Sequence, residues 1–192
     1  RLRAGLDRPS RIRDRRVSKT FKARPTTYRG IQMRSRLEAG FAQWLDGWPI
    51  MRWSYEPRAF ASERGQYFPD FAAEDVRCDW LDGSRRVYFE IKPSTFGIQE
   101  AWDDDDHWPG TATYDEGEAA EVALHDRMHI IWDSEPEAAL IIVKQRVGGG
   151  ARFTALMQED DGGSTAVDVE PAISDWVSLQ PAFVVDHRVH PV

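Results

Sequence analysis

The sequence predicts an α/β fold in which a helix, an antiparallel three-strand meander, a second helix and a further strand follow one another. Three observations support this prediction. Two segments carry apolar residues at helical spacing. Several shorter apolar runs are bounded by glycine, proline and aspartate turn signals. The chain of 192 residues is 41% hydrophobic, which is enough to bury the core of one domain.

The first helix is predicted over residues 32–46, where apolar side chains recur on one helical face. Gly47 and Pro49 follow and favour its end. Residues 1–29 precede it as an arm that is irregular or partly helical, because two prolines interrupt it.

Three strands are expected after this helix. Residues 52–60 and 66–76 predict two strands joined by a turn at 63–65. The dipeptide Asp82-Gly83 is a strong turn signal and leads to a third strand at 85–93. Short turns between successive strands favour an antiparallel meander.

The second half of the chain predicts a polar loop at 94–114, a helix at 116–132, a buried strand at 138–147, a strand at 151–158, a short strand at 165–169 and a short helix at 173–179. We therefore expect three parts: a basic arm (1–29), a core (30–147) and a β-rich extension of the same domain (148–192).

Asp70, Glu90 and Lys92 stand at the ends of two apolar runs of the expected meander. Alternation along a strand places Glu90 and Lys92 on one face and Ile91 on the other. If the two strands are neighbours, two carboxylates and an ammonium group converge. Converging carboxylates hold hard cations such as Mg²⁺, which activates water and stabilises charge on a phosphate under attack. The structural alternative is that Pro-Asp starts a turn and that the charges protect an edge strand.

The pattern Pro69-Asp70 … Glu90-Ile91-Lys92 resembles the signature of the PD-(D/E)xK nuclease superfamily. Arg34–Phe41 resembles the Glu-bearing helix that this superfamily often places before its strands. The features together look most like phage-type and TnsA-like transposon endonucleases. The resemblance covers residues 30–93 well and 115–147 loosely.

This resemblance implies a set of roles. Asp70 and Glu90 would bind Mg²⁺ directly, with the backbone carbonyl of Ile91 as a third ligand, and Mn²⁺ would substitute for Mg²⁺. Glu38 would hold the metal through water, and Lys92 would orient the attacking water and stabilise charge on the phosphate. Gln99 is the nearest match to a further polar residue that some members carry.

The charge of the chain is divided unevenly. Its net charge is −7, yet residues 1–36 contain 13 of the 25 basic residues and 2 of the 32 acidic ones. A basic arm before an acidic body is typical of nucleic-acid binding. The arginines and lysines expected to contact DNA phosphates are Arg11, Arg13, Arg15, Arg16, Lys19, Lys22, Arg24, Arg34 and Arg36. The alternatives are an arm that contacts the protein's own acidic surface or a protein partner.

Two further clusters have both a metal-binding and a structural interpretation. Asp103–Asp106 beside His107 suggest either an extra metal site or, in our preferred interpretation, a solvated loop. His125 and His129 have the spacing of a zinc motif, but Asp126 stands where that motif has glutamate.

Other function classes lack their signals. No apolar run reaches the length of a membrane span. There is no glycine-rich phosphate loop, so we expect no nucleotide cofactor. No signal peptide is visible, and the single cysteine, Cys78, fits a reducing compartment. We therefore expect a cytoplasmic protein encoded by a bacterium or a phage.

The expected function is Mg²⁺-dependent hydrolysis of DNA, by a homodimer or within a larger DNA-processing complex. Two alternatives stay open: a DNA-binding or assembly protein that does not cut, and a subunit that cuts only within a transposase or phage complex. Sequence, branch and strand specificity do not follow from these residues.

Deletion of residues 1–24 tests the role of the basic arm. The deletion removes ten basic and two acidic residues and leaves an acidic body. We expect weaker DNA binding and a flatter plot of log affinity against log salt concentration, because fewer counterions are released. Fluorescence anisotropy at three salt concentrations measures both. An unchanged affinity and slope would assign the arm to a protein partner.

Overall fold

The computed structural model describes residues 23–48, 51–94, 96, 111–146, 148–159, 164–175 and 180–185. In these ranges the chain is a mixed α/β structure, mostly of strands. The elements are β1 (Thr26–Tyr28), β2 (Ile31–Met33), α1 (Arg36–Asp46), β3 (Arg52–Tyr55), β4 (Phe60–Ser62), β5 (Gly65–Tyr67), β6 (Phe71–Cys78), β7 (Ser84–Lys92), α2 (Thr111–Trp132), β8 (Ala139–Gln145), β9 (Ala151–Gln158), β10 (Ser164–Asp175) and β11 (Gln180–Val185).

Six strands form a barrel-like sheet in the order β6-β7-β8-β9-β10-β11. The sheet closes because β11 also pairs with β6 in parallel, with Ala182 beside Arg77 and Phe183 beside Cys78. Strands β7 and β8 are parallel neighbours, and α2 lies between them in the chain. Closure removes the free edges that an open sheet would expose.

Strand β6 belongs to the barrel over only part of its length. Its first residues pair with β3, from Phe71 to Glu74, and its last two pair with β11. A register shift against β7 separates these halves, between Ala73 and Val76. A bulge bends a strand, which explains how β6 changes partners. The N-terminal end of β6, next to Asp70, is thereby held between β3 and β7.

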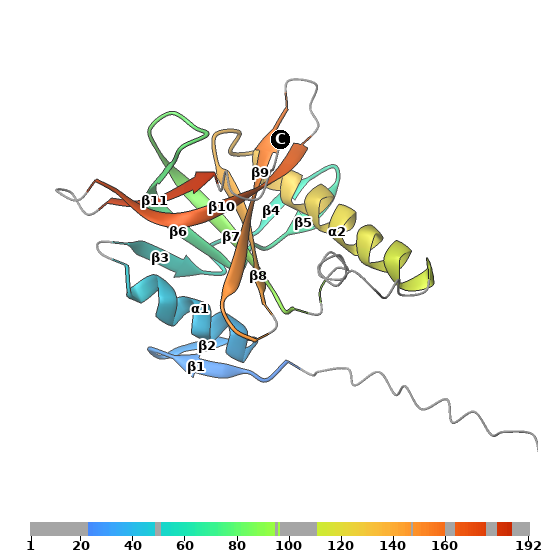
Figure 1. Ribbon diagram of the computed structural model, residues 1–192, viewed down its shortest axis with the longest axis horizontal. Coiled ribbons are helices and arrows are strands. Elements are labelled where there is room, and N and C mark those ends of the chain that lie inside the picture. The colour runs from blue at the N-terminus through green and yellow to red at the C-terminus, as the bar shows by residue number, and fades with distance from the viewer. Residues whose placement is uncertain are drawn as a thin grey trace, which may run out of the picture.

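The two helices cover different faces of the sheet. Inward side chains of β6, β7 and β8, such as Phe71, Phe89 and Ile141, share one core cluster with α1. The alternate residues, such as Ala72 and Tyr88, pack with α2 and the β4–β5 hairpin in a second cluster. Figure 1 shows α1 beside the β1–β2 hairpin and α2 beside the β4–β5 hairpin.

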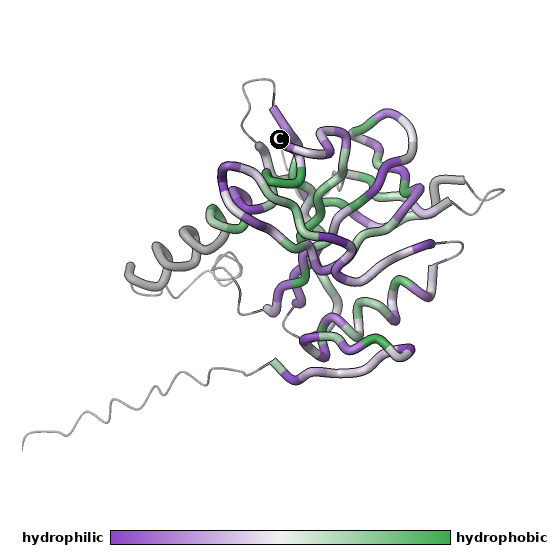
Figure 2. The backbone as a smooth tube through the Cα atoms, turned by 180° about the vertical axis from the view of Figure 1, so that it is seen from behind, coloured by the Kyte–Doolittle hydropathy of each residue, from purple (hydrophilic) through white to green (hydrophobic). Residues whose placement is uncertain are grey.

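Hydropathy follows this arrangement. The apolar segments of the strands run through the middle of the molecule, and hydrophilic segments lie mainly in its outer loops (Figure 2). Among the described residues, no helix combines the length and the apolar character that crossing a bilayer requires.

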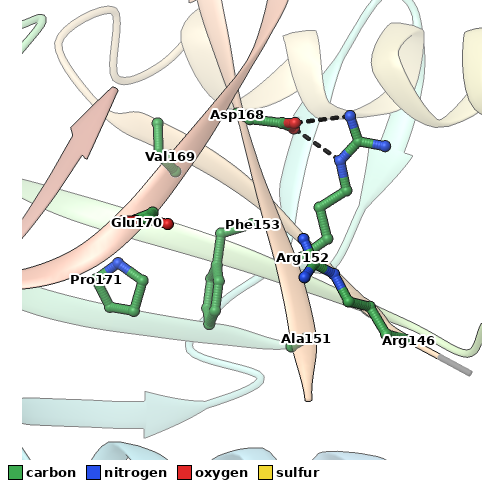
Figure 3. A pocket seen from close by; sticks show the side chains of 8 residues that line it. All are labelled: Arg146, Ala151, Arg152, Phe153, Asp168, Val169, Glu170 and Pro171. Atoms are coloured by element: carbon green, nitrogen blue, oxygen red, sulfur yellow. Dashed lines mark hydrogen bonds and ion pairs between the residues drawn. The ribbon is translucent and has the colours of Figure 1, made fainter. Parts of the chain in front are cut away.

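A partly buried ion pair joins β9 to β10. Arg152 donates from Nε and Nη2 to the two carboxylate oxygens of Asp168, at 2.8 and 2.7 Å (Figure 3). Thr154 Oγ1 donates to Asp168 at 3.3 Å. The pair borders a cavity of about 250 Å³ that Phe153 and Pro171 also line. Because the Arg152 guanidinium pairs with both oxygens of Asp168 and so compensates its charge, we assign this pair a structural role.

The mixed α/β class is confirmed, and so are the strands at 139–145 and 151–158. The meander is confirmed only as the antiparallel neighbours β3, β6 and β7. The turn at 63–65 joins β4 to β5 instead, and the expected strand at 66–76 is divided, because β5 ends at Tyr67 and β6 begins at Phe71.

The expected strand at 165–169 is longer and runs from Ser164 to Asp175. The helix expected at 173–179 is therefore wrong for residues 173–175, and 176–179 lie outside the described residues. This part of β10 pairs with β11, with Ala172 beside Ala182 and Ile173 beside Pro181, and such tertiary pairing outweighs local propensity.

The N-terminal boundary of the first helix also differs. Residues 31–33 are a strand of the β1–β2 hairpin rather than the first turn of the helix, which begins at Arg36. Arg29 and Gly30 between the strands both have positive φ, 47° and 82°. This matches a two-residue type I′ hairpin turn, which Asn-Gly signals more clearly than Arg-Gly does. The expected 52–60 strand ends at Tyr55, and a separate hairpin of β4 and β5 follows.

Phe71 tests the larger of the two cores. It is fully buried, and the rings of Phe41, Trp53 and Tyr55 lie 5.2 to 5.7 Å from it. We expect Phe71→Ala to lower the unfolding free energy by about 3–5 kcal/mol. Phe68→Ala is the matched control, because Phe68 is 51% exposed, and it should change stability by less than about 0.5 kcal/mol. Urea unfolding measures both, and equal losses would contradict this packing.

Candidate active site

Asp70 lies directly before β6 and is almost completely buried, at 3% exposure. The backbone N–H of Ile91 donates to its Oδ2 at 2.7 Å, which fixes the carboxylate against β7. The guanidinium of Arg34 donates to its Oδ1. The backbone carbonyl of Asp70 accepts a hydrogen bond from the N–H of Glu56 at 2.9 Å. The position of the Asp70 carboxylate is therefore set by both neighbouring strands.

Glu90 lies on β7 and is 7% exposed. Tyr67 donates its hydroxyl to Oε2 at 2.5 Å, and Lys92 donates from Nζ to Oε1 at 2.5 Å. The side chain of Ile91 packs on the opposite face of β7, in the core cluster that includes α1, which confirms the expected alternation along this strand. The Lys92 ammonium also lies 5.1 Å from the centre of the Phe96 ring. The structure thus brings Asp70, Glu90 and Lys92 to one place.

The two carboxylates repel one another, and both are almost completely buried. Burial and the charge of Glu90 raise the pKa of Asp70, and the hydrogen bond from Ile91 and the charge of Arg34 lower it; the net result is a pKa of about 7. Burial and the neighbouring Glu90 also raise the pKa of Tyr67, so this hydroxyl stays protonated and donates. Perturbed titration beside a specific charge partner is typical of functional sites, although structural networks produce it too.

Glu38 has a clear structural function at the start of α1. The N-cap residue is Ser35, whose Oγ accepts from the Glu38 N–H at 3.1 Å and donates to Oε1 at 2.9 Å. Oε2 accepts from the Arg34 N–H at 3.0 Å and from the Tyr55 hydroxyl at 2.6 Å. This is close to a capping box, a Ser-x-x-Glu pattern that our sequence interpretation did not use. A role for Glu38 towards a metal through water stays a prediction.

Arg34 forms ion pairs with several acidic residues of the site. Besides its bond to Asp70, its Nε lies 3.1 Å from Glu56 and 3.9 Å from Glu38. Nearby carboxylates and a hydrogen bond with Tyr55 raise the pKa of Arg34 above its ordinary value, against the effect of burial. Arg34 was expected only to contact DNA phosphates, and its position among three carboxylates was not predicted.

The site offers only a few oxygen ligands to a hard cation. Within the described residues, no three His, Cys, Asp or Glu side chains are arranged to hold a metal ion. Asp70 and Glu90 nevertheless supply buried oxygen ligands. The N–H and C=O of one strand residue point to the same side, so the Ile91 carbonyl faces the side of Asp70. Mg²⁺ is commonly held by one or two carboxylates together with water and substrate phosphates. The site therefore fits Mg²⁺ better than a metal that needs a complete protein cage.

The remaining expected site residues divide into two groups. Arg24 is exposed next to β1, and Arg36 begins α1, where it borders a cavity of about 610 Å³ with Trp44 and Ile91. The others lie outside the described residues: Arg11, Arg13, Arg15, Arg16, Lys19, Lys22, Gln99, Asp103–Asp106 and His107.

Of the two histidines of the possible zinc motif, His129 has structural contacts. His129 Nε2 is 2.9 Å from Ser164 Oγ, and its ring stands edge-on to Trp132 at 4.8 Å.

Tyr55, Glu56 and Tyr67 take part in the site without having been predicted. Tyr67 belongs to the same Tyr-Phe-Pro-Asp stretch as Asp70, so its neighbourhood in sequence was a usable signal. Tyr55 and Glu56 come from β3 and its end, and only the pairing of Tyr55 with Phe71 places them there. Such pairing across 16 positions leaves no local mark in the sequence.

Comparison of the chain with protein-family models, with curated proteins and with solved structures finds no match in any of the three.

The buried Asp70 makes stability depend on pH. An unfolded Asp ionises near pH 4, whereas this carboxyl ionises near pH 7 in the fold. Between these values the folded state binds more protons, so ionisation of Asp70 lowers the unfolding free energy as pH rises. Without divalent metal, the difference between wild type and Asp70→Asn should therefore shift in favour of the variant between pH 4 and pH 7, by about 2–4 kcal/mol. Urea unfolding at four pH values measures this difference, and a constant difference would contradict it.

Proposed function

We propose that the protein is a Mg²⁺-dependent DNA endonuclease of the PD-(D/E)xK type. The observation that carries the proposal is the placement of Asp70, Glu90 and Lys92. Two buried carboxylates come from the adjoining ends of two paired strands, and a lysine ammonium lies against one of them. Burying like charges side by side destabilises a fold, which supports a functional explanation of the arrangement.

The order of elements supports the same proposal. Helix α1, strands β3, β6 and β7, helix α2 and strand β8 follow one another in the order that the resemblance requires. The interposed β4–β5 hairpin and the closure of the sheet through β9, β10 and β11 are additions to that order. The proposal therefore rests on the site residues first and on the topology second.

Each residue has a defined task in the proposed reaction. Asp70 and Glu90 would hold Mg²⁺, with the Ile91 carbonyl beside them. When bound, the ion supplies an activated water and stabilises charge on the phosphate. Tyr67 donates to Glu90 and fixes the orientation of that carboxylate. Lys92 orients the attacking water and stabilises the charge that develops on the phosphate.

A second candidate is a DNA-binding or assembly protein that does not cut. The favouring observation is that all four oxygens of Asp70 and Glu90 already accept hydrogen bonds from protein groups. This alternative explains the carboxylates as a closed ionic network. A third candidate, a subunit that cuts only inside a transposase or phage complex, shares the chemistry of the first and differs in its need for a partner.

Nicking of a supercoiled plasmid with and without Mg²⁺ tests the proposal. Asp70→Asn and Lys92→Ala should each lower the Mg²⁺-dependent rate by a factor of at least about 100, because each removes charge from the reacting centre. Lys92→Ala should still bind Mn²⁺ in calorimetry, since both carboxylates remain.

Asp75→Asn is the matched control for the loss of a negative charge. Asp75 lies on the same strand, its side chain is 70% exposed, and asparagine tolerates its positive φ. This control should keep the wild-type rate. If Asp70→Asn also nicks at the wild-type rate, Asp70 is not a ligand and the proposal fails. If wild type does not nick but binds DNA, the second candidate is favoured.

A further inference from the structure

Arg34 occupies the acidic side of the site in the way a bound cation would. Its guanidinium contacts Asp70 Oδ1 and lies 3.1 Å from Glu56. Of the groups that hold Asp70 in place, the Ile91 N–H is fixed in the sheet, whereas Arg34 is a long side chain at the surface. The donor to Oδ1 of Asp70 is thus the exposed Arg34 guanidinium rather than a group of the sheet.

The backbone of Arg34 is held by hydrogen bonds, whereas its side chain is largely exposed. The backbone N–H of Arg34 is held by Glu38 at 3.0 Å and by the Tyr55 hydroxyl at 3.1 Å. The side chain is 56% exposed, although Asp70, its partner, is only 5% exposed at the side chain. Rotating the guanidinium outwards therefore breaks ion pairs without opening the core.

The charged groups around Arg34 carry an excess of negative charge. Arg34 lies beside the carboxylates of Glu38, Glu56 and Asp70. Glu90, whose charge acts on Asp70, pairs with Lys92. With all groups ionised, these six groups have a formal charge of −2. When the guanidinium leaves Asp70, the four carboxylates and Lys92 carry −3, and a divalent cation reduces this charge to −1. Two positive groups on the same oxygen repel one another, so the cation and the guanidinium exclude each other at Asp70.

We propose that Arg34 is the internal counter-ion of the metal-free site, that a divalent cation displaces its guanidinium from Asp70, and that the displaced guanidinium then contacts a phosphate of the DNA. This inference rests on the proposed function and extends it by coupling metal binding to phosphate binding. The planar guanidinium forms paired hydrogen bonds with carboxylate and phosphate alike, so the exchange of one for the other conserves its geometry.

The coupling predicts opposite effects of one substitution. Without DNA, Arg34→Gln removes the competitor for Asp70, so the dissociation constant for Mn²⁺ should fall on the order of tenfold. With DNA, the same substitution removes a phosphate contact. The gain in affinity for a short duplex on adding Ca²⁺ should then be smaller than in wild type.

Calorimetry with Mn²⁺ and fluorescence anisotropy with Ca²⁺ provide the two measurements. Arg52→Gln is the matched control, because it removes an equal charge from an exposed arginine that also pairs with an aspartate, Asp75; its Mn²⁺ dissociation constant should change by less than about twofold. Arg34→Lys should lie between wild type and Arg34→Gln, since an ammonium does not reproduce the planar fork. It also serves if Arg34→Gln does not fold, as judged by circular dichroism.

The outcomes separate this inference from the proposed function. Wild type and folded Arg34→Gln that bind Mn²⁺ with equal affinity would overturn the competition and leave the metal site in place. An equal Ca²⁺-linked gain in DNA affinity would overturn the phosphate contact. If neither protein binds Mn²⁺, the inference and the proposed function both fail.

Discussion

The burial of Asp70 and Glu90 at adjoining strand ends is the constraint on which the rest of the site depends. Each carboxylate oxygen accepts from a protein donor, drawn from Arg34, the Ile91 N–H, Tyr67 and Lys92. Those donors offset burial and repulsion only in part, since the pKa of Asp70 still rises to about 7. A buried pair of this kind keeps negative charge that a positively charged group stabilises. This charge explains the position of Arg34, and under the proposed function it would attract a divalent cation.

Three elements of the fold, β7, β6 and α1, position the residues of the site. Strand β7 places Glu90 and Lys92 on the face opposite Ile91, which anchors the strand in the inner core. The bulge in β6 turns its N-terminal end away from the barrel and towards β3. The capped start of α1 then fixes the backbone of Arg34 through Glu38. Two separate cores, one under α1 and one under α2, hold these elements rigid on either side of the sheet.

Local patterns predicted what depends on local chemistry. Helical spacing located α1 and α2, the Asp82-Gly83 signal located the turn between β6 and β7, and strand alternation placed Glu90 and Lys92 together. Long-range pairing had no such signal, so neither the closure of the sheet by β11 nor the contact of Tyr55 with Glu38 was predicted. The capping box at Ser35 was visible in the sequence and was not used. The strand at 173–175 was mistaken for a helix because its partner, β11, decides its conformation.

Diffraction from crystals grown with Mn²⁺, collected at the manganese absorption edge, tests the central claim most directly. We expect one anomalous peak within ligand distance of Asp70 and Glu90, with the Arg34 guanidinium turned away from Asp70. Crystals of Asp70→Asn grown in the same way should lack this peak. A wild-type crystal that contains Mn²⁺ elsewhere, with the ion pair between Arg34 and Asp70 intact, would contradict a metal-dependent site and favour the closed ionic network.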